Sequence, residues 1–344
     1  MAPFQINNRY NFHYVVLVRA IMKILIYEYL TSGAQYALSI DDPLMAEGNN
    51  MILALLNDGL ELPSQYQLYT IRDHRFPPLS PDFDPIQVAL VTSPPHYQQV
   101  INKQLADCDA ALIIAPESDA CLAQQQQRLN DYNILNLGSS VNAIVQATNK
   151  YRYPQLLAHS PLKTPETLRA ADWLHNPTFY SSGYISKPLD GAGCIQTHYW
   201  QTAAQLTDYL QQADISLAHY IIQPYITGNP ISISALINGT HCQILSINQQ
   251  QISQQHCQLH MTGTIVNGAS NAVPVALADN IIQQLLTQLP GLSGFIGVDI
   301  ILHQHQPYII DINPRITSSY IGLAQIMAAN PLHLLLQPTM SIAS

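Results

Sequence analysis

Short apolar runs alternate with stretches of helical periodicity over the first part of the chain. Runs rich in branched and aromatic residues predict strands, and they cover residues 23–30, 67–72, 87–92 and 110–115. Apolar residues at helical spacing predict helices at residues 43–58 and 96–106. Strands that alternate with helices across short turns are typical of a parallel sheet with helices on its faces. This part of the sequence therefore predicts an α/β unit that ends near residue 140.

The pattern changes after Asn149-Lys150, where strands no longer alternate regularly with helices. Apolar runs predict strands at residues 184–188, 220–223, 232–237, 242–248, 294–302 and 307–313. Helical spacing predicts helices at residues 201–213 and 277–289. Asn238-Gly239 lies between two of these strands and is a type I′ turn signal, so we expect that pair to be antiparallel.

Composition excludes several classes of protein. The chain has 344 residues, of which 47% are hydrophobic and only 10% are charged, and its formal net charge is −9. The 13 Lys and Arg residues form no basic run, which argues against nucleic-acid binding, because neutralising a phosphate backbone requires clustered cations. No apolar stretch reaches the ~20 residues that a membrane span needs. The five cysteines form no C-x-x-C pair, so we expect reduced thiols in a cytoplasmic protein.

The first 21 residues do not resemble a signal peptide. Arg19 and Lys23 closely follow the apolar residues 14–17, and no small-residue cleavage site appears. The run MKILIY at residues 22–27 looks like a natural chain start that enters the first strand. We therefore expect residues 1–21 to be a loosely ordered extension. A Gln-rich tract at residues 124–127 is short and predicts a solvated helix face.

The sharpest chemical signal is a pair of apolar segments that each carry an acid, GVDII at residues 297–301 and IIDIN at residues 309–313. If they form a hairpin, facing residue numbers sum to about 610, so Asp299 faces Asp311. Asn313 shares the face of Asp311, because side chains alternate along a strand. Facing carboxylates repel unless a cation lies between them, and two carboxylates with an amide oxygen suit Mg²⁺. Solvated acids at strand ends and an aspartic-protease dyad are weaker alternatives, because apolar residues flank both acids and no Asp-Thr-Gly loop occurs.

Basic residues are scarce, so the few near these segments are informative. Arg315 lies two residues beyond the second acid-bearing strand, where it would stabilise phosphoryl or oxyanion oxygens; a surface ion pair is the alternative. Lys187 lies on a predicted strand before a loop with Gly191 and Gly193, whose backbone can approach phosphates closely. In isolation this loop is equally a β-turn beside a snorkelling lysine, and Lys150 alone would be an ordinary surface lysine.

Polar residues also follow two strands of the N-terminal unit. Glu28 and Ser32 lie at the end of the first predicted strand, and Glu117 follows the fourth. In parallel α/β sheets, ligands bind beyond the carboxyl ends of the strands. We therefore expect Glu28, Ser32 and Glu117 to contact the substrate.

Taken in order, these elements resemble the ATP-grasp superfamily over roughly residues 23–335. The matching elements are Asn149-Lys150, Lys187-Pro188 with the Gly191 and Gly193 loop, Gln223-Pro224-Tyr225-Ile226, Asp299, and Asp311-Ile312-Asn313-Pro314-Arg315. The resemblance implies a Rossmann-like α/β domain at residues 22–140, followed by an ATP-grasp fold of two α+β subdomains at residues 141–219 and 220–344.

The resemblance also implies a role for each element. The implied ATP contacts are Lys150, Lys187, Gly191, Gly193, Gln223, Tyr225 and Ile226. The implied ligands of Mg²⁺, which would also suit Mn²⁺, are Asp299, Asp311 and Asn313. Arg315 and Lys187 would be catalytic, with Arg315 steadying an acyl phosphate.

Three segments resemble the tyramine–glutamate ligase group of methanofuran biosynthesis in particular. They are IYEY at residues 26–29, IIAPE at residues 113–117 and NPRITSS at residues 313–319. This implies an ATP-dependent carboxylate–amine ligase that forms an amide through an acyl phosphate, from small molecules such as glutamate and tyramine. The resemblance is compatible with a homodimer. A ligase of another amino-acid pair, similar to D-alanine–D-alanine ligase, and a non-catalytic ATP-binding regulatory protein are the alternatives.

Some positions depart from the superfamily pattern. Gln223 stands where the hinge usually carries Glu, so adenine recognition would use an amide. Pro230 stands near the usual position of a ribose-binding acid, and Cys194 replaces a frequent third glycine. Asp311 stands where Glu is common among the metal ligands.

Overall fold

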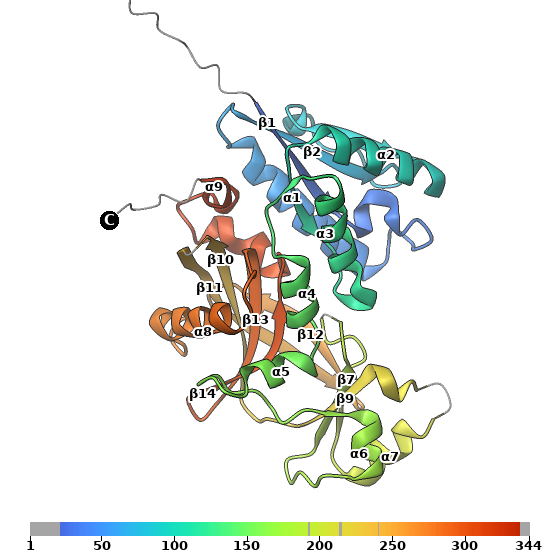
Figure 1. Ribbon diagram of the computed structural model, residues 1–344, viewed down its shortest axis with the longest axis vertical. Helices are drawn as coiled ribbons and strands as arrows, with labels where there is room; N and C mark the ends of the chain where they lie inside the picture. The colour runs from blue at the N-terminus through green and yellow to red at the C-terminus, as the bar shows by residue number, and fades with distance from the viewer. Residues whose placement is uncertain (1–20, 192, 213–214, 240, 338–344) are drawn as a thin grey trace, which may run out of the picture.

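The computed structural model of the protein contains two β-sheets, one in each half of the chain (Figure 1). The described residues are 21–191, 193–212, 215–239 and 241–337. The predicted N-terminal extension lies outside the described residues except for Ile21, so that expectation stays a prediction.

The N-terminal sheet is parallel, with the strand order β3-β2-β1-β4-β5. Its strands are β1 (Met22–Glu28), β2 (Tyr66–Asp73), β3 (Gln87–Val91), β4 (Ala110–Ile114) and β5 (Leu135–Asn136). Its helices are α1 (Pro43–Leu60), α2 (Pro94–Asp107) and α3 (Cys121–Asp131). Successive side chains of β1 point to opposite faces, so Ile24 and Ile26 pack with α1, while Leu25 and Tyr27 pack with α2 and α3. The predicted parallel sheet with helices on both faces is confirmed.

The second sheet has the strand order β14-β13-β10-β11-β12-β8-β7-β9-β6. Its strands are β6 (Leu168–Arg169), β7 (Tyr184–Pro188), β8 (His198–Trp200), β9 (Tyr220–Pro224), β10 (Asn229–Asn238), β11 (His241–Gln255), β12 (Gln258–Ile265), β13 (Gly294–His303) and β14 (Gln306–Asn313). The accompanying helices are α4 (Val141–Ala147), α5 (Arg152–Leu157), α6 (Ala170–His175), α7 (Ala203–Leu210), α8 (Val275–Gln288) and α9 (Pro331–Leu336). The pairs between these strands are antiparallel, which agrees with the predicted α+β second half.

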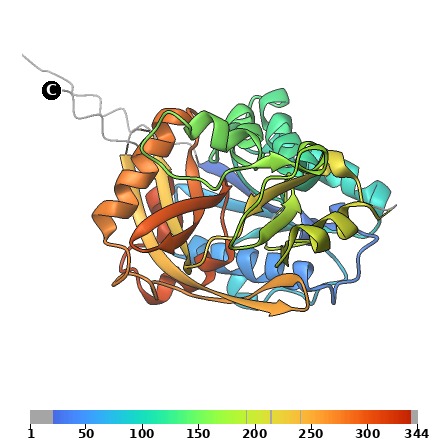
Figure 2. The ribbon, with the colours of Figure 1, turned by 90° about the horizontal axis from the view of Figure 1, so that it is seen from below.

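One apolar cluster packs the second sheet, and another joins the two halves of the chain. Helix α8 lies against the second sheet, where Ile281 and Leu285 share a buried cluster with Ile300 (Figure 2). A second cluster joins Leu55 of α1 to Phe295 of β13 and to residues near the C-terminus, so the two halves of the chain share part of their core. Burial of apolar surface between them fixes the relative position of the two sheets.

The division into subdomains remains a proposal. Strand β9 begins at Tyr220, the residue at which the predicted C-terminal subdomain also begins. However, β9 pairs with β7 and β6 and not with β10. We therefore propose to place this boundary after Pro224, in the segment that leads into β10.

The polar hairpin formed by β11 and β12 was not predicted. The sequence predicted a strand that ends at Asn248, whereas β11 continues to Gln255 and then pairs with β12. Glutamines dominate this extension, so it lacks the apolar alternation that marks a half-buried strand. The predicted solvated face of α3 is wrong at Gln126, which is 1% exposed.

Within the described ranges, no helix is long and apolar enough to cross a membrane.

The interface between the halves gives a pH-dependent prediction. Burial raises the pKa of the Asp58 carboxyl, which accepts a hydrogen bond from the Tyr320 hydroxyl across this interface. A carboxyl whose folded pKa is raised stabilises the fold below its unfolded pKa, and this contribution is lost as pH rises through the folded pKa. Asp58→Asn cannot ionise, so we expect its unfolding free energy to increase relative to the wild type between about pH 4 and about pH 7.

Urea unfolding across that range measures this difference. The control Asp131→Asn removes an exposed carboxylate from α3. If the difference in unfolding free energy between Asp58→Asn and the wild type stays constant with pH, the raised pKa of Asp58 is contradicted.

Candidate active site

A cavity of about 1030 Å³ lies between the carboxyl edge of the N-terminal sheet and the second sheet. It brings together most of the residues that the sequence singled out. The predicted site residues that line it are Glu28, Lys150, Lys187, Gly191, Gly193, Gln223, Tyr225, Ile226, Asp299, Asp311, Asn313 and Arg315. Ser32 and Glu117 do not line it.

The hairpin of β13 and β14 sets the geometry of the two acids. Asp299 and Asp311 are register partners, and Asn313 pairs with Gly297. The turn residues Gln304 and His305 have φ of 47° and 66°, as a two-residue I′ turn requires. The predicted facing of the acids is therefore confirmed.

The facing carboxylates and the amide form a compact oxygen cluster. The Asn313 amide donates to Asp299 Oδ2 at 3.3 Å, and Gln250 of β11 donates to Asp299 Oδ1 at 3.0 Å. Burial and, to a smaller extent, the charge of Asp311 raise the pKa of Asp299 to about 6. A divalent cation relieves this repulsion, and carboxylate and amide oxygens are the ligands that Mg²⁺ prefers.

The donor set therefore fits a magnesium ion, with Asp299, Asp311 and Asn313 as the residues that would hold it. Among the residues that the structure describes, no group of three or more His, Cys, Asp or Glu could hold a metal ion. The cluster contains only two carboxylates, and its third ligand would be an amide. Substrate phosphates and water complete the coordination of magnesium in such sites.

Two buried lysines balance the acids. Lys150 Nζ lies 2.9 Å from Asp311 Oδ1 and donates to the Gly191 carbonyl at 2.7 Å. Lys187 is 7% exposed, and its Nζ donates to the Ile310 carbonyl at 2.9 Å. Burial and, to a smaller extent, the charge of Lys150 lower the pKa of Lys187 to about 8. Two cations beside the oxygen cluster suit a polyanionic ligand such as a triphosphate.

The glycine loop and the predicted adenine hinge also line the cavity, beside the two lysines. Gly191 and Gly193 have φ of +145° and +66°, values that residues other than glycine rarely adopt. An ideal Cβ on Gly193 would meet no atom within 4 Å, so backbone conformation and not crowding favours glycine there. Gln223 of β9 is 2% exposed and donates to Thr167 Oγ1 at 2.8 Å, which orients its amide.

The strand-end residues differ in their placement. Glu28 is 1% exposed, and its carboxylate accepts from the backbone N–H groups of Leu30 and Thr31 at 3.2 and 2.6 Å. Ser32 Oγ donates to the Tyr29 carbonyl at 2.8 Å and is fully buried, so it stabilises the turn after β1. Only Glu28 of these two reaches the cavity. The proposed substrate contact of Ser32 thus lacks structural support.

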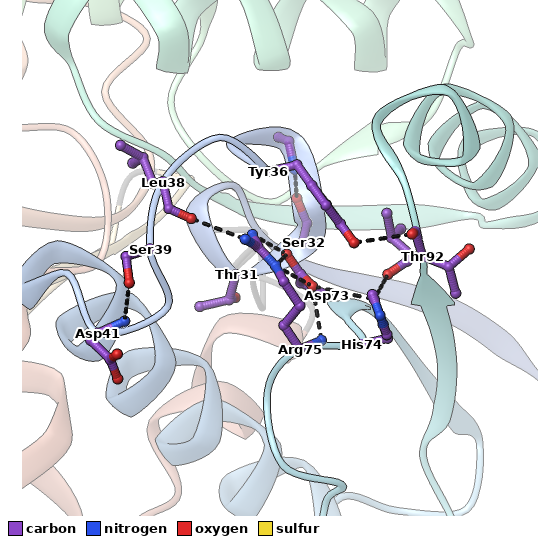
Figure 3. A network of polar contacts seen from close by, with 12 residues as sticks. Thr31, Ser32, Tyr36, Leu38, Ser39, Asp41, Asp73, His74, Arg75 and Thr92 are labelled. Carbon is purple, nitrogen blue, oxygen red and sulfur yellow. Dashed lines mark hydrogen bonds and ion pairs between the residues drawn. The ribbon is translucent and has the colours of Figure 1, made fainter.

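A polar network holds the segment after Ser32 in place (Figure 3). Asp73 at the end of β2 is fully buried and forms an ion pair with Arg75 at 2.7 Å. Arg75 donates to the Leu38 carbonyl at 3.1 Å and lies over the ring of Tyr36. Tyr36 in turn donates to the Thr92 carbonyl at 3.0 Å. These contacts fix the segment against β2 and β3.

Some cavity residues had no sequence signal. Gln250 orients Asp299 from the unpredicted hairpin, and Glu47 lines the cavity from α1. Glutamine and glutamate residues are mostly exposed in proteins, so the sequence alone gives no reason to place Gln250 or Glu47 in a cavity.

Comparison with known proteins identifies the class. The family model for the ATP-grasp domain matches residues 147–319, and the model for a pre-ATP-grasp domain matches residues 66–144. The chain belongs to the ATP-grasp family. The predicted resemblance to this superfamily is thereby confirmed.

Curated relatives and solved structures agree with this assignment. Tyramine–L-glutamate ligases of Methanocaldococcus fervens and Methanocaldococcus jannaschii are 29% and 28% identical, over 87% and 90% of this chain and 89% and 87% of theirs. An ATP-grasp superfamily protein of Archaeoglobus fulgidus has a TM-score of 0.67 at 24% identity, over 92% of this chain and 88% of that chain. D-alanine–D-alanine ligase of Bacillus anthracis has a TM-score of 0.61 at 16% identity, over 92% and 96%. The solved structures support the fold.

The predicted class of enzyme is confirmed as well. The chain is an ATP-grasp ligase, which forms a carbon–nitrogen bond at the expense of ATP. Its fold implies ATP binding with a divalent metal ion.

The oxygen cluster leads to a direct prediction. Asp311→Asn removes one carboxylate from the proposed metal site, so the Mg²⁺ concentration for half-maximal ATP binding should rise by at least about tenfold. Calorimetric titration of ATP at several Mg²⁺ concentrations measures this effect. The control Asp208→Asn removes an exposed carboxylate of α7. An unchanged Mg²⁺ dependence in Asp311→Asn would contradict the proposed ligand set.

Proposed function

We propose that this ligase joins a carboxylate of glutamate to tyramine or a closely related amine. The observation that carries the proposal is the division of charge in the cavity. Lys150, Lys187 and Arg315 line its ATP-grasp side, where the proposed magnesium ion would neutralise Asp299 and Asp311. Among the described lining residues of the N-terminal domain there is no Lys or Arg, whereas Glu28 and Glu47 are present. A cavity with one basic and one acidic wall suits an anionic nucleotide and a cationic amine.

The first step is phosphoryl transfer from ATP to the substrate carboxylate. A carboxylate oxygen attacks the γ-phosphorus, the bond to the ADP oxygen breaks, and an acyl phosphate forms. Lys150 and Lys187 would neutralise the phosphate oxygens, and the glycine loop would cover them. Asp299, Asp311 and Asn313 would hold magnesium, or Mn²⁺ in its place, which would neutralise negative charge on the phosphates.

The second step forms the amide. The ammonium group first loses a proton to solvent, and the neutral amine nitrogen attacks the acyl carbon. The carbon–oxygen bond to phosphate breaks, and the nitrogen gives its second proton to the departing phosphate or to solvent. Arg315 would bind the departing phosphate oxygens, because its guanidinium lines the cavity on the basic side. The protein's own contribution is mainly to position the two substrates and to balance charge.

The acidic wall supports an amine acceptor without a carboxylate. Its charged members are accompanied by apolar side chains, with Leu38, Leu44 and Met51 lining the same side. A primary amine with an apolar ring matches both features. The corresponding amino acid adds a carboxylate that would face Glu28 and Glu47, and like charges discriminate against a ligand.

The chain's cysteines fit a reducing compartment. All five are described and none forms a disulfide. We therefore include a cytoplasmic location in the proposal.

Acceptor choice tests the proposal. With glutamate and ATP, tyramine should support ADP release with a kcat/KM at least about tenfold above that of tyrosine. Mass detection of the glutamyl amide identifies the product. Glu47→Gln should raise the KM for tyramine and leave the KM for ATP within about twofold, because the residue lies on the acidic wall. Equal use of tyrosine, or no amide from either acceptor, would contradict the proposed function.

A further inference from the structure

A buried ion pair joins the two halves of the chain beside the cavity. Arg315 Nε donates to Glu117 Oε1 at 2.7 Å, and Arg315 Nη2 donates to Glu117 Oε2 at 2.8 Å. The side chains of Arg315 and Glu117 are 11% and 3% exposed. Two parallel hydrogen bonds fix the plane of a guanidinium, which a single bond or a mobile surface pair does not do.

The donor count of Arg315 shows what this arrangement leaves available. A guanidinium has five N–H donors. Glu117 accepts two of them, and the Ile316 carbonyl accepts a third from Nη1 at 2.9 Å. One N–H therefore remains on each terminal nitrogen. Arg315 lines the cavity and Glu117 does not, so Glu117 approaches the guanidinium from the protein side.

The backbone after Glu117 is held in an unusual conformation. Asp119 and Ala120 both have φ of 55°, in the left-handed region that residues other than glycine rarely adopt. The Asp119 N–H donates to Asp190 Oδ2 at 2.9 Å, next to the glycine loop. Such strained backbone persists where surrounding contacts determine it, and it clusters at functional sites. The same short segment thus contacts both Arg315 and the loop that precedes Gly191.

We propose that Glu117 is a positioning residue, which holds Arg315 so that its two remaining N–H donors face the phosphoryl group transferred in the reaction. This role replaces the substrate contact that the sequence suggested for Glu117, and it rests on the proposed function. Contact between the N-terminal domain and the ATP-grasp half then completes the anion site, because Glu117 and Arg315 come from different halves of the chain.

The kinetic test uses Glu117→Gln, which keeps the shape of the side chain but loses the charge and one acceptor oxygen. We expect kcat for carboxylate-dependent ADP release to fall about 10- to 100-fold, with the KM for ATP within about twofold of the wild type. Arg315→Lys should have a similar effect. If Glu117 acts through Arg315, the kcat of the double variant should lie within about threefold of the kcat of the slower single variant. The proposal would be overturned if the losses of kcat in the two single variants multiply in the double variant. It would also be overturned if Glu117→Gln has a kcat close to that of the wild type.

Two controls separate this role from a merely structural one. Asp131→Asn removes an exposed charge from the same domain and should leave kcat unchanged. Thermal unfolding establishes that each variant is folded. If Glu117→Gln does not fold, Glu117→Asp keeps the charge but withdraws it by one methylene, and the same loss of kcat with an unchanged KM for ATP is expected.

A binding measurement keeps this inference separate from the proposed function. Orthovanadate mimics a phosphoryl group in flight, and its binding to the complex of the protein with Mg²⁺ and ADP requires no ligase substrate. We expect Glu117→Gln to weaken vanadate binding about tenfold and to leave ADP binding within about twofold. If the wild type forms no amide, the proposed function fails while this titration still decides the role of Glu117. Equal vanadate affinity in the two proteins would refute it.

Discussion

The site depends on two partly buried carboxylates, Asp299 and Asp311, that face each other across β13 and β14. Carboxylates in this position destabilise a sheet unless cations compensate them. Lys150 compensates Asp311 directly, and Lys187 lies next to the same strand. The arrangement therefore favours a ligand that brings a divalent cation together with several negative charges. A metal–nucleotide complex has this composition.

The same electrostatic logic extends to the domain interface. The cavity is basic toward the second sheet and acidic toward the N-terminal sheet, and the shared apolar core holds the two walls in place. Glu117 of the N-terminal domain forms an ion pair with Arg315 of the ATP-grasp half. In our proposal, the contacts between the halves do more than stabilise the fold, because they also set the orientation of Arg315.

Residues with a periodic or paired pattern could be predicted from the sequence. The strand pattern predicted the parallel sheet, and the spacing of Asp299 and Asp311 predicted their register, because apolar alternation leaves few alternatives for a hairpin. Ser32 and Glu117 shared the same strand-end signal as Glu28, but only tertiary contacts decide which side chain reaches the cavity. The β11–β12 hairpin and Gln250 could not be predicted, since a polar strand is stabilised by its neighbours and not by its own pattern.

The most direct test of the central claim concerns the metal and the nucleotide together. Pulsed electron paramagnetic resonance of Mn²⁺ bound with ATP detects phosphorus nuclei next to the metal. The account predicts phosphorus couplings in the wild type, and loss of the bound signal at the same Mn²⁺ and ATP concentrations when Asp299 and Asp311 are both replaced by Asn. Unchanged couplings in the doubly substituted protein would contradict it, because the metal would then be held elsewhere.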